Sequence, residues 1–256
     1  MMILASDYDG TLKINNVISD SDRQAIEQFR SQGNKFGIVT GRSIGMIRNE
    51  LKLMQLNYDF IIGGNGAVIA DENGQVIRQN NIELEDAMQL INYVCHDKNN
   101  MIGVSNGVEF GNIQDGCINE EHNTNDLIET EMVNGYDIIC SNKINSFYFK
   151  AETLYKTKQM YEVCKEMLKG RVNFHFNNGI IDATAYDIDK KTGVLKLKEL
   201  FDGDIHVIGD GYNDLPMIEY FGGYTLTHAD EVIKEKASQV FDNIAQCIQT
   251  IQINKK

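Results

Sequence analysis

The sequence is poor in the residues that mark secreted and membrane proteins. It has one proline, no tryptophan and five cysteines in 256 residues, and no two cysteines form a CxxC pair. An odd, scattered set of cysteines argues against a disulfide framework or a zinc site and favours a reducing cytosol. The start MMILASDYDG lacks a basic segment before an apolar one, and no apolar run approaches the roughly 18 residues of a membrane helix. We therefore expect a cytoplasmic protein that is neither secreted nor inserted in a membrane.

Basic residues are also scarce. Lysine and arginine total 24 against 37 acidic residues, which gives a formal net charge of −13. This balance argues against nucleic acid as a partner, since such proteins bind phosphates through many basic side chains. It does not exclude a small anionic substrate, because surface charge is screened over about 8 Å in physiological salt. With 42% hydrophobic residues, the chain can bury the core of two domains of common size.

The most informative segment is ILASDYDGTLK, in which Asp7 and Asp9 follow an apolar run that is typical of a buried parallel strand. Gly10 allows the chain to turn there, so both carboxylates can approach one point beyond the strand end. Two like charges this close need a cation or a shared proton, and Mg²⁺ favours such oxygen ligands. The alternative is a simple turn, because Asp, Gly and Thr are common loop residues.

A second segment, IHVIGDGYNDLPMI, repeats this pattern near the other end of the chain. An apolar run is followed by a glycine-flanked loop with Asp210 and Asp214, and then by a helix that we expect to begin at Leu215. Pro216 suits the first turn of that helix, and Asp214 suits its N-cap. Capping is therefore the alternative interpretation of Asp214, although it does not account for Asp210.

Two further segments offer groups that bind phosphate oxygens. Thr40, Gly41 and Arg42 follow a strand-like run and precede a helix expected near Ser43, where hydroxyls and free amides can bind an anion. In YDIDKKTGVLKLKEL, a lysine next to an expected helix could hold a phosphate oxygen as a compact charge. Without the acidic loops, both segments would be ordinary: a helix cap and a pair of surface lysines.

Taken in order, these segments resemble the four motifs of the haloacid dehalogenase superfamily of phosphohydrolases. DYDGT resembles the first motif, Thr40 the second, the Lys190 region the third and GDGYND the fourth. The NGA sequence at 65–67 and the long interval before the lysine resemble the Cof-type branch. In that branch a large type IIB cap domain lies between the second and third motifs.

The resemblance implies a catalytic role for both aspartates of the first motif. Asp7 would attack phosphorus and become an aspartyl phosphate, while Asp9 would protonate the leaving group and later activate water. It also implies a Mg²⁺ site made by the Asp7 carboxylate, the Asp9 carbonyl and Asp210, with Asp214 nearby or bound through water. An aspartate at position 9 favours phosphatase over dehalogenase chemistry.

The resemblance further implies that Thr40 and Lys190 act catalytically by holding the transferring phosphoryl group. Gly41, Arg42 and Asn213 are additional candidates for phosphate binding. The lysine motif leaves one register open, because Lys191 directly follows Lys190; we predict that Lys190 is the motif lysine.

The order of patterns predicts the fold class: an α/β protein with a Rossmann-like parallel core sheet and an inserted α+β cap domain. Strand-like runs and a helix expected over 20–31 alternate in the core, which is typical of a parallel sheet with its site at the carboxyl ends of the strands. The expected core strands span 2–6, 36–39, 59–62 and 205–208. The expected cap elements are strands near 101–105, 145–150, 171–176 and 180–184, and helices near 84–95 and 154–169.

We predict a discontinuous core of residues 1–79 and 185–256, with the cap at 80–184. The cap should close over the leaving group and so govern specificity. Candidate contacts are Arg42, Asn65 and polar groups of 112–143, among them His122. For His122, a place on the surface is the favoured interpretation over a role as a ligand. His175 is expected on an exposed strand face.

The sequence therefore predicts a Mg²⁺-dependent phosphatase that acts on small phosphorylated metabolites, with sugar phosphates as the leading class. A phosphosugar mutase of related fold is the second enzymatic possibility. A receiver-like phosphate-sensing module is the non-enzymatic one, although such modules are shorter and lack a large inserted domain. We expect a monomer or a homodimer.

Overall fold

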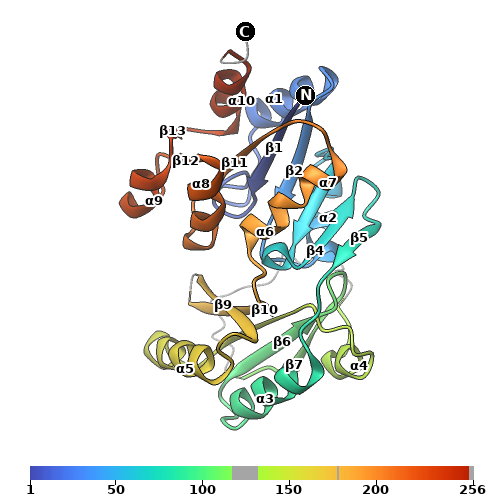
Figure 1. Ribbon diagram of the computed structural model, residues 1–256, viewed down its shortest axis with the longest axis vertical. Coiled ribbons are helices and arrows are strands. Elements are labelled where there is room, and N and C mark those ends of the chain that lie inside the picture. The colour runs from blue at the N-terminus through green and yellow to red at the C-terminus, as the bar shows by residue number, and fades with distance from the viewer. Residues whose placement is uncertain (117–131, 178, 254–256) are drawn as a thin grey trace.

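The computed structural model describes residues 1–116, 132–177 and 179–253. Figure 1 shows two bodies, each built around its own sheet, with the chain passing between them in two places. The first passage follows β5 and the second lies between β10 and α6. His122 and part of the polar stretch 112–143 lie outside the described residues.

The larger body contains an eight-stranded sheet within the described residues, in the order β13-β12-β11-β1-β2-β3-β4-β5. The strands from β13 to β3 are parallel, whereas β4 and β5 are antiparallel additions. Their bounds are β1 Met2–Asp7, β2 Lys35–Val39, β3 Phe60–Gly63, β4 Val68–Asp71, β5 Val76–Gln79, β11 Asp204–Ile208, β12 Tyr224–Leu226 and β13 Gln239–Phe241.

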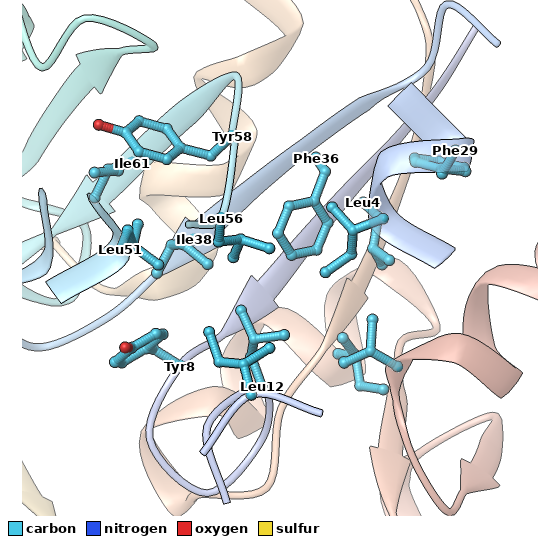
Figure 2. Packing of buried hydrophobic residues seen from close by; sticks show 14 of the residues in the cluster. Leu4, Tyr8, Leu12, Phe29, Phe36, Ile38, Leu51, Leu56, Tyr58 and Ile61 are labelled. Atoms are coloured by element: carbon cyan, nitrogen blue, oxygen red, sulfur yellow. The ribbon is translucent and has the colours of Figure 1, made fainter. Parts of the chain in front are cut away.

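The helices of this body are α1 Asp20–Ser31, α2 Ile44–Leu53, α6 Lys190–Leu195, α7 Leu197–Leu200, α8 Leu215–Phe221, α9 Glu231–Lys236 and α10 Ile244–Ile253. Two 3₁₀ turns, η1 Gly64–Gly66 and η2 Tyr212–Asp214, follow strands β3 and β11. The helix predicted over 20–31 is confirmed, and Ser19 caps it by accepting a hydrogen bond from the Asp22 N–H. Apolar residues of α1 and α2 pack with those of β1 and β2 in one buried cluster (Figure 2).

The central strand β1 is buried along its whole length and pairs with β2 and β11. Such a strand is covered on both faces, which is why its sequence is continuously apolar rather than alternating. The pairing brings the end of β1 next to the ends of β2 and β11. The two halves of the sequence-predicted core therefore meet at one edge of the sheet.

The smaller body contains an antiparallel sheet in the order β7-β6-β8-β10-β9. Apolar residues from one face of this sheet pack against α3, α4 and α5. The bounds are α3 Leu84–Val94, β6 Met101–Ser105, β7 Phe110–Gln114, α4 Gly135–Cys140, β8 Ser146–Lys150, α5 Leu154–Met167, β9 Val172–Asn177 and β10 Ile180–Ala185.

The predicted fold class is confirmed, because a mainly parallel α/β sheet is accompanied by a separate antiparallel sheet. The domain boundaries at 79/80 and 184/185 stay a prediction; β5 ends at Gln79 and β10 at Ala185. The cysteines among the described residues, Cys95, Cys140, Cys164 and Cys247, are free thiols. Within the same residues, no helix has both the length and the apolar character to cross a membrane.

Candidate active site

Three of the predicted site residues lie where neighbouring parallel strands end. Asp7 is the last residue of β1, Thr40 directly follows β2, and Asp210 follows β11 in the loop before η2. Because β2, β1 and β11 are adjacent and parallel, their carboxyl ends lie at the same edge of the sheet. Residues far apart in the sequence are thereby brought together.

Lys190 lies between two of the predicted carboxylates. Its Nζ is 2.6 Å from Asp7 Oδ1 and 2.6 Å from Asp214 Oδ1. The Lys190 and Asp214 side chains are each only 1% exposed, so this pair is held almost without water. A charge in such surroundings requires a partner, and Lys190 has two.

The start of α6 fixes which of the two neighbouring lysines enters the site. Asp189 caps this helix, with its side chain accepting from the Thr192 N–H, and Lys190 is the first helical residue. The backbone of Asp189 presses against Gly66, where an added Cβ would lie 2.1 Å from the Asp189 carbonyl oxygen. Lys191 is 33% exposed and its Nζ lies 3.9 Å from Asp189. The geometry therefore favours Lys190 in the predicted register.

Asp214 does not act as a side-chain cap of α8, which was the alternative interpretation. Helix α8 has no side-chain cap hydrogen bond at this residue. One carboxylate oxygen of Asp214 binds Lys190, and the other accepts a hydrogen bond of 2.9 Å from the Gly211 N–H. A Cβ on Gly209 would lie 2.4 Å from the Asp214 carboxyl carbon, so the loop leaves room for this carboxylate only because Gly209 has no side chain.

Burial makes the carboxylates of this cluster weak acids in the absence of a metal. Burial, together with the charge of Asp214, raises the pKa of Asp7 to about 7, although Lys190 opposes the change. Burial and the neighbouring carboxylates also raise the pKa values of Asp210 and Asp214. Burial alone would lower the pKa of Lys190, but Asp214 and Asp7 outweigh it and raise that pKa. The cluster thus holds more negative charge than its one lysine balances.

The same carboxylates fit a divalent cation. Oxygen atoms of Asp7, Asp210 and Asp214 all lie within 4.8 Å of one another. Thr11 Oγ1 donates to Asp210 Oδ1 at 2.6 Å, and a Cβ on Gly10 would lie 2.4 Å from Asp210 Oδ2. Gly10 has a φ of +90°, so a larger residue would be strained there as well as crowded. This set of hard oxygen donors suits Mg²⁺, and a bound cation would balance the excess negative charge.

Asp9 lies apart from this carboxylate cluster and pairs with Arg42. Arg42 Nε donates to Asp9 Oδ2 at 2.7 Å, and Arg42 Nη2 donates to Asp9 Oδ1. The Asp9 side chain is 43% exposed and can therefore meet a molecule entering the site. Arg42, predicted as a phosphate-binding candidate, binds Asp9 and Glu50 in this structure.

Asn65 connects the remaining predicted residues. Its side-chain oxygen accepts from Asn213 Nδ2 at 3.1 Å, and its Nδ2 donates to Asp182 of the smaller body at 3.0 Å. Its backbone N–H donates to the Thr40 carbonyl at 2.9 Å. Asn213 therefore contacts Asn65, and a Cβ on Gly41 would lie 3.1 Å from Asn65 Nδ2. One fully buried residue, Asn65, thus joins the second-motif and fourth-motif loops to the cap through its backbone N–H and its side chain.

Comparison with known proteins agrees with this geometry. The family model described as haloacid dehalogenase-like hydrolase matches residues 4–246. The chain belongs to this family. The curated proteins that match it include several named as phosphatases or putative phosphatases.

Individual relatives are distant but match nearly the whole chain. The 5-amino-6-(5-phospho-D-ribitylamino)uracil phosphatase of Bacillus subtilis (strain 168) is 25% identical, over 94% of this chain and 89% of its own. The structure of a haloacid dehalogenase subclass IIB sugar phosphatase has a TM-score of 0.82 at 20% identity, covering 99% of this chain and all of that one. A haloacid dehalogenase-like hydrolase from Bacteroides thetaiotaomicron has a TM-score of 0.78 at 21% identity, covering 97% and 98%. At these identities the two structures support the fold alone.

In this haloacid dehalogenase-like hydrolase, the cap contributes a polar row that the sequence interpretation missed. Asp182 is in register with Tyr148 on one side and His175 on the other, and Tyr148 is in register with Gly103. Directly opposed residues of antiparallel strands share a face of the sheet. Since Asp182 contacts Asn65, this face is the one that meets the core.

The signal for Asp182 was present in the sequence. It is a lone acid between Ile181 and Ala183, both of which are buried in the cap core. Burial raises the pKa of Asp182 to about 6, although Asn65 and Lys190 oppose this change. His175 is half-buried rather than exposed, so that expectation was wrong; burial lowers its pKa. The cause is that its strand face turns toward the core and not toward solvent.

Proposed function

We propose that this protein is a Mg²⁺-dependent phosphatase that hydrolyses small phosphorylated metabolites through an aspartyl-phosphate intermediate. The observation that carries the proposal is the position of Lys190 Nζ, 2.6 Å from both Asp7 and Asp214, beside a third carboxylate from the neighbouring strand. Phosphoryl transfer requires mainly positioning and neutralisation of charge, and this cluster is built for both.

In the first step, a carboxylate oxygen of Asp7 attacks phosphorus and the bond from phosphorus to the leaving-group oxygen breaks. Asp9 gives a proton to that oxygen, so the leaving group departs as an alcohol. In the second step, Asp9 takes a proton from water, the water oxygen attacks phosphorus, and the bond to Asp7 breaks to release phosphate. Dividing the reaction between Asp7 and Asp9 replaces one difficult displacement with two easier ones.

Lys190 holds an oxygen of the transferring group throughout, and Thr40 is the second residue assigned to this task. Asp7, Asp210 and the Asp9 carbonyl, with Asp214 beside them, would hold Mg²⁺, which would supply positive charge to the phosphoryl oxygens and favour the ionised form of Asp7.

The cap row supports a small, hydroxyl-bearing leaving group, which is the chemistry of sugar phosphates. Asp182 offers a hydrogen-bond acceptor beside Asn65, and the Tyr148 hydroxyl donates to Asn112 Oδ1 at 2.9 Å on the same sheet. A partly buried acceptor favours a partner that can donate a hydrogen bond and disfavours one that cannot.

The test is phosphate release from a panel of sugar phosphates, phosphoglycolate and nucleotide phosphates. We expect Mg²⁺-dependent turnover that EDTA removes and that Asp7→Asn lowers by at least about 10³-fold. Asp137→Asn, on an exposed cap helix, is the matched control and should retain full activity. Robust turnover by Asp7→Asn would contradict the mechanism, and an isomerised sugar phosphate in place of free phosphate would identify a mutase.

A further inference from the structure

Four charged side chains form a closed ring beside the proposed acid–base residue. Arg42 binds both oxygens of Asp9 with one edge of its guanidinium, and its Nη1 donates to Glu50 Oε2 at 2.8 Å. Glu50 Oε1 accepts from Lys13 Nζ at 2.7 Å, and Lys13 Nζ lies 3.4 Å from Asp9 Oδ1. Two cations thus alternate with two carboxylates, and each member touches two others.

Tyr8, the residue between Asp7 and Asp9, lies next to both cations of the ring. Lys13 Nζ lies 5.1 Å and the Arg42 guanidinium 5.6 Å from the centroid of the Tyr8 ring, which is fully buried. Figure 2 shows Tyr8 in the same apolar cluster as Leu12 and Leu51. A cation over an aromatic face is attracted by the ring, so Tyr8 helps to hold both cations in place.

Exposure falls around the ring from the substrate side to the core side. The Asp9 side chain is 43% exposed and Arg42 30%, whereas Glu50 is 15% and Lys13 8% exposed. Asp9 and Arg42 therefore face the site, and Glu50 and Lys13 lie behind them. Glu50 belongs to α2, and its two carboxylate oxygens accept hydrogen bonds from Lys13 and Arg42.

This arrangement controls where the Asp9 carboxylate points. A guanidinium is planar, and holding it at two edges fixes both its position and its plane. With Glu50 in place, Arg42 presents a fixed fork to Asp9. Without Glu50, Arg42 is held at one edge only, and its flexible side chain is free to swing toward the phosphate and take Asp9 out of line.

We propose that Glu50 is a positioning residue for the acid–base chemistry of Asp9, acting through Arg42 and seated by Lys13. The inference rests on the proposed function, because it assumes that Asp9 protonates the leaving group. Glu50 itself lies outside the four motifs and acts on the reaction only through Arg42 and Asp9.

Loss of Glu50 should affect substrates differently according to whether their leaving group needs a proton. An alkyl phosphate such as a sugar phosphate must receive a proton as its bond to phosphorus breaks, whereas p-nitrophenolate departs readily as an anion. General acid catalysis contributes about 10²–10⁴-fold when it is needed. Since kcat/KM reports the steps up to release of the leaving group, the second, hydrolytic use of Asp9 does not enter the comparison.

The experiment compares kcat/KM of Glu50→Gln for an alkyl phosphate from the panel and for p-nitrophenyl phosphate. We expect a loss of about tenfold to a hundredfold for the alkyl phosphate and of less than about twofold for the aryl phosphate. The ratio of the two constants does not depend on how much of the preparation is folded. Glu50→Asp, which keeps the charge but reaches only one of its two cations, should give an intermediate ratio.

Glu219→Gln is the matched control, because Glu219 forms an exposed ion pair with Lys236 on the same body. Its ratio should equal that of the wild type. Equal losses on both substrates, or no loss on either, would overturn the positioning role while leaving the phosphatase proposal intact. Failure of the wild type to release phosphate from any substrate would instead overturn the proposed function itself.

A double-mutant cycle tests independently whether Glu50 acts through Asp9. If Glu50 acts through Asp9, adding Glu50→Gln to Asp9→Asn should lower the alkyl-phosphate kcat/KM by less than about twofold. A further loss as large as that of the single variant would mean that Glu50 acts independently of Asp9, contrary to the proposal.

Discussion

The core and the cap contribute to one site by different rules. In the core, Asp7, Thr40 and Asp210 lie at or just after the ends of adjacent parallel strands, so the topology of the sheet brings them together. In the cap, Asp182, Tyr148 and His175 lie on three adjacent antiparallel strands that end at the edge strand β9, and only the register between the strands aligns them. The core residues are thus suited to a fixed chemical task, whereas a row on a sheet face can change its members without altering the fold.

The largest effect should come from breaking the core cluster at its cation. We expect Lys190→Ala to lower kcat/KM by about 10²–10³-fold and to destabilise the protein by about 3–5 kcal/mol, because Asp7 and Asp214 are left buried without a partner. Lys191→Ala should retain activity within about twofold. Steady-state kinetics and denaturant unfolding measure both variants, and normal turnover by Lys190→Ala would assign the role to its neighbour.

A change in the cap row should act on the substrate and not on the chemistry. Asp182→Ala should lower kcat/KM by about tenfold for leaving groups that bear hydroxyls, while leaving p-nitrophenyl phosphate within about threefold, because a partly buried acceptor is lost. Asp182→Asn keeps the shape of the side chain, so its kcat/KM for these leaving groups should lie between the values of the wild type and of Asp182→Ala. Equal losses on both substrate types would assign Asp182 to the core machinery.

Protons and metal should compete for the core cluster but not for the cap row. With a pKa of about 7 in the metal-free protein, Asp7 carries a proton at pH 6 that must leave when Mg²⁺ binds. Mg²⁺ affinity should therefore fall about tenfold from pH 8 to pH 6. Calorimetric titration measures this change, and Asp7→Asn should flatten it; an affinity independent of pH in the wild type would contradict the argument.

The smallest expected effect probes the packing of the cap row. A Cβ on Gly103 would lie 2.0 Å from Tyr148 Cζ, so Gly103→Ala must displace the phenol ring. We expect KM for the preferred substrate to rise about threefold with kcat little changed, since the nucleophile and lysine lie elsewhere. Gly170→Ala tests substitution at a cap glycine with no atom near its Cβ position, although its positive φ carries a strain cost of its own.

Local patterns in the sequence indicate candidate site residues in the core more directly than in the cap. An apolar run followed by a glycine and an aspartate specifies both a strand and the residue at its end, as for Asp7 and Asp210. Lys190 followed from its motif, and the helix start that orients it is encoded by the adjacent Asp189. The α/β class and the expected strands and helices followed from the same kind of local pattern.

Register and side-chain partnership could not be predicted in this way. No local pattern in β10 indicates that Asp182 lies opposite Tyr148 or that Asp182 contacts Asn65. In the same way, the contact of Glu50 with Arg42 depends on how α2 lies against the loop that carries Lys13. These relations come from tertiary packing, which a single sequence does not encode at the level of individual residues.

The pairing of β1 with β11 has a consequence for how the protein is made. Met2–Asp7 leaves the ribosome well before its partner Asp204–Ile208, which follows only after the whole cap has been synthesised. Contacts between such distant segments form late, because a long loop must close before they yield any stabilisation. The nucleophile is therefore translated long before the residues that make it reactive, and a truncated nascent chain carries Asp7 without Lys190, Asp210 or Asp214.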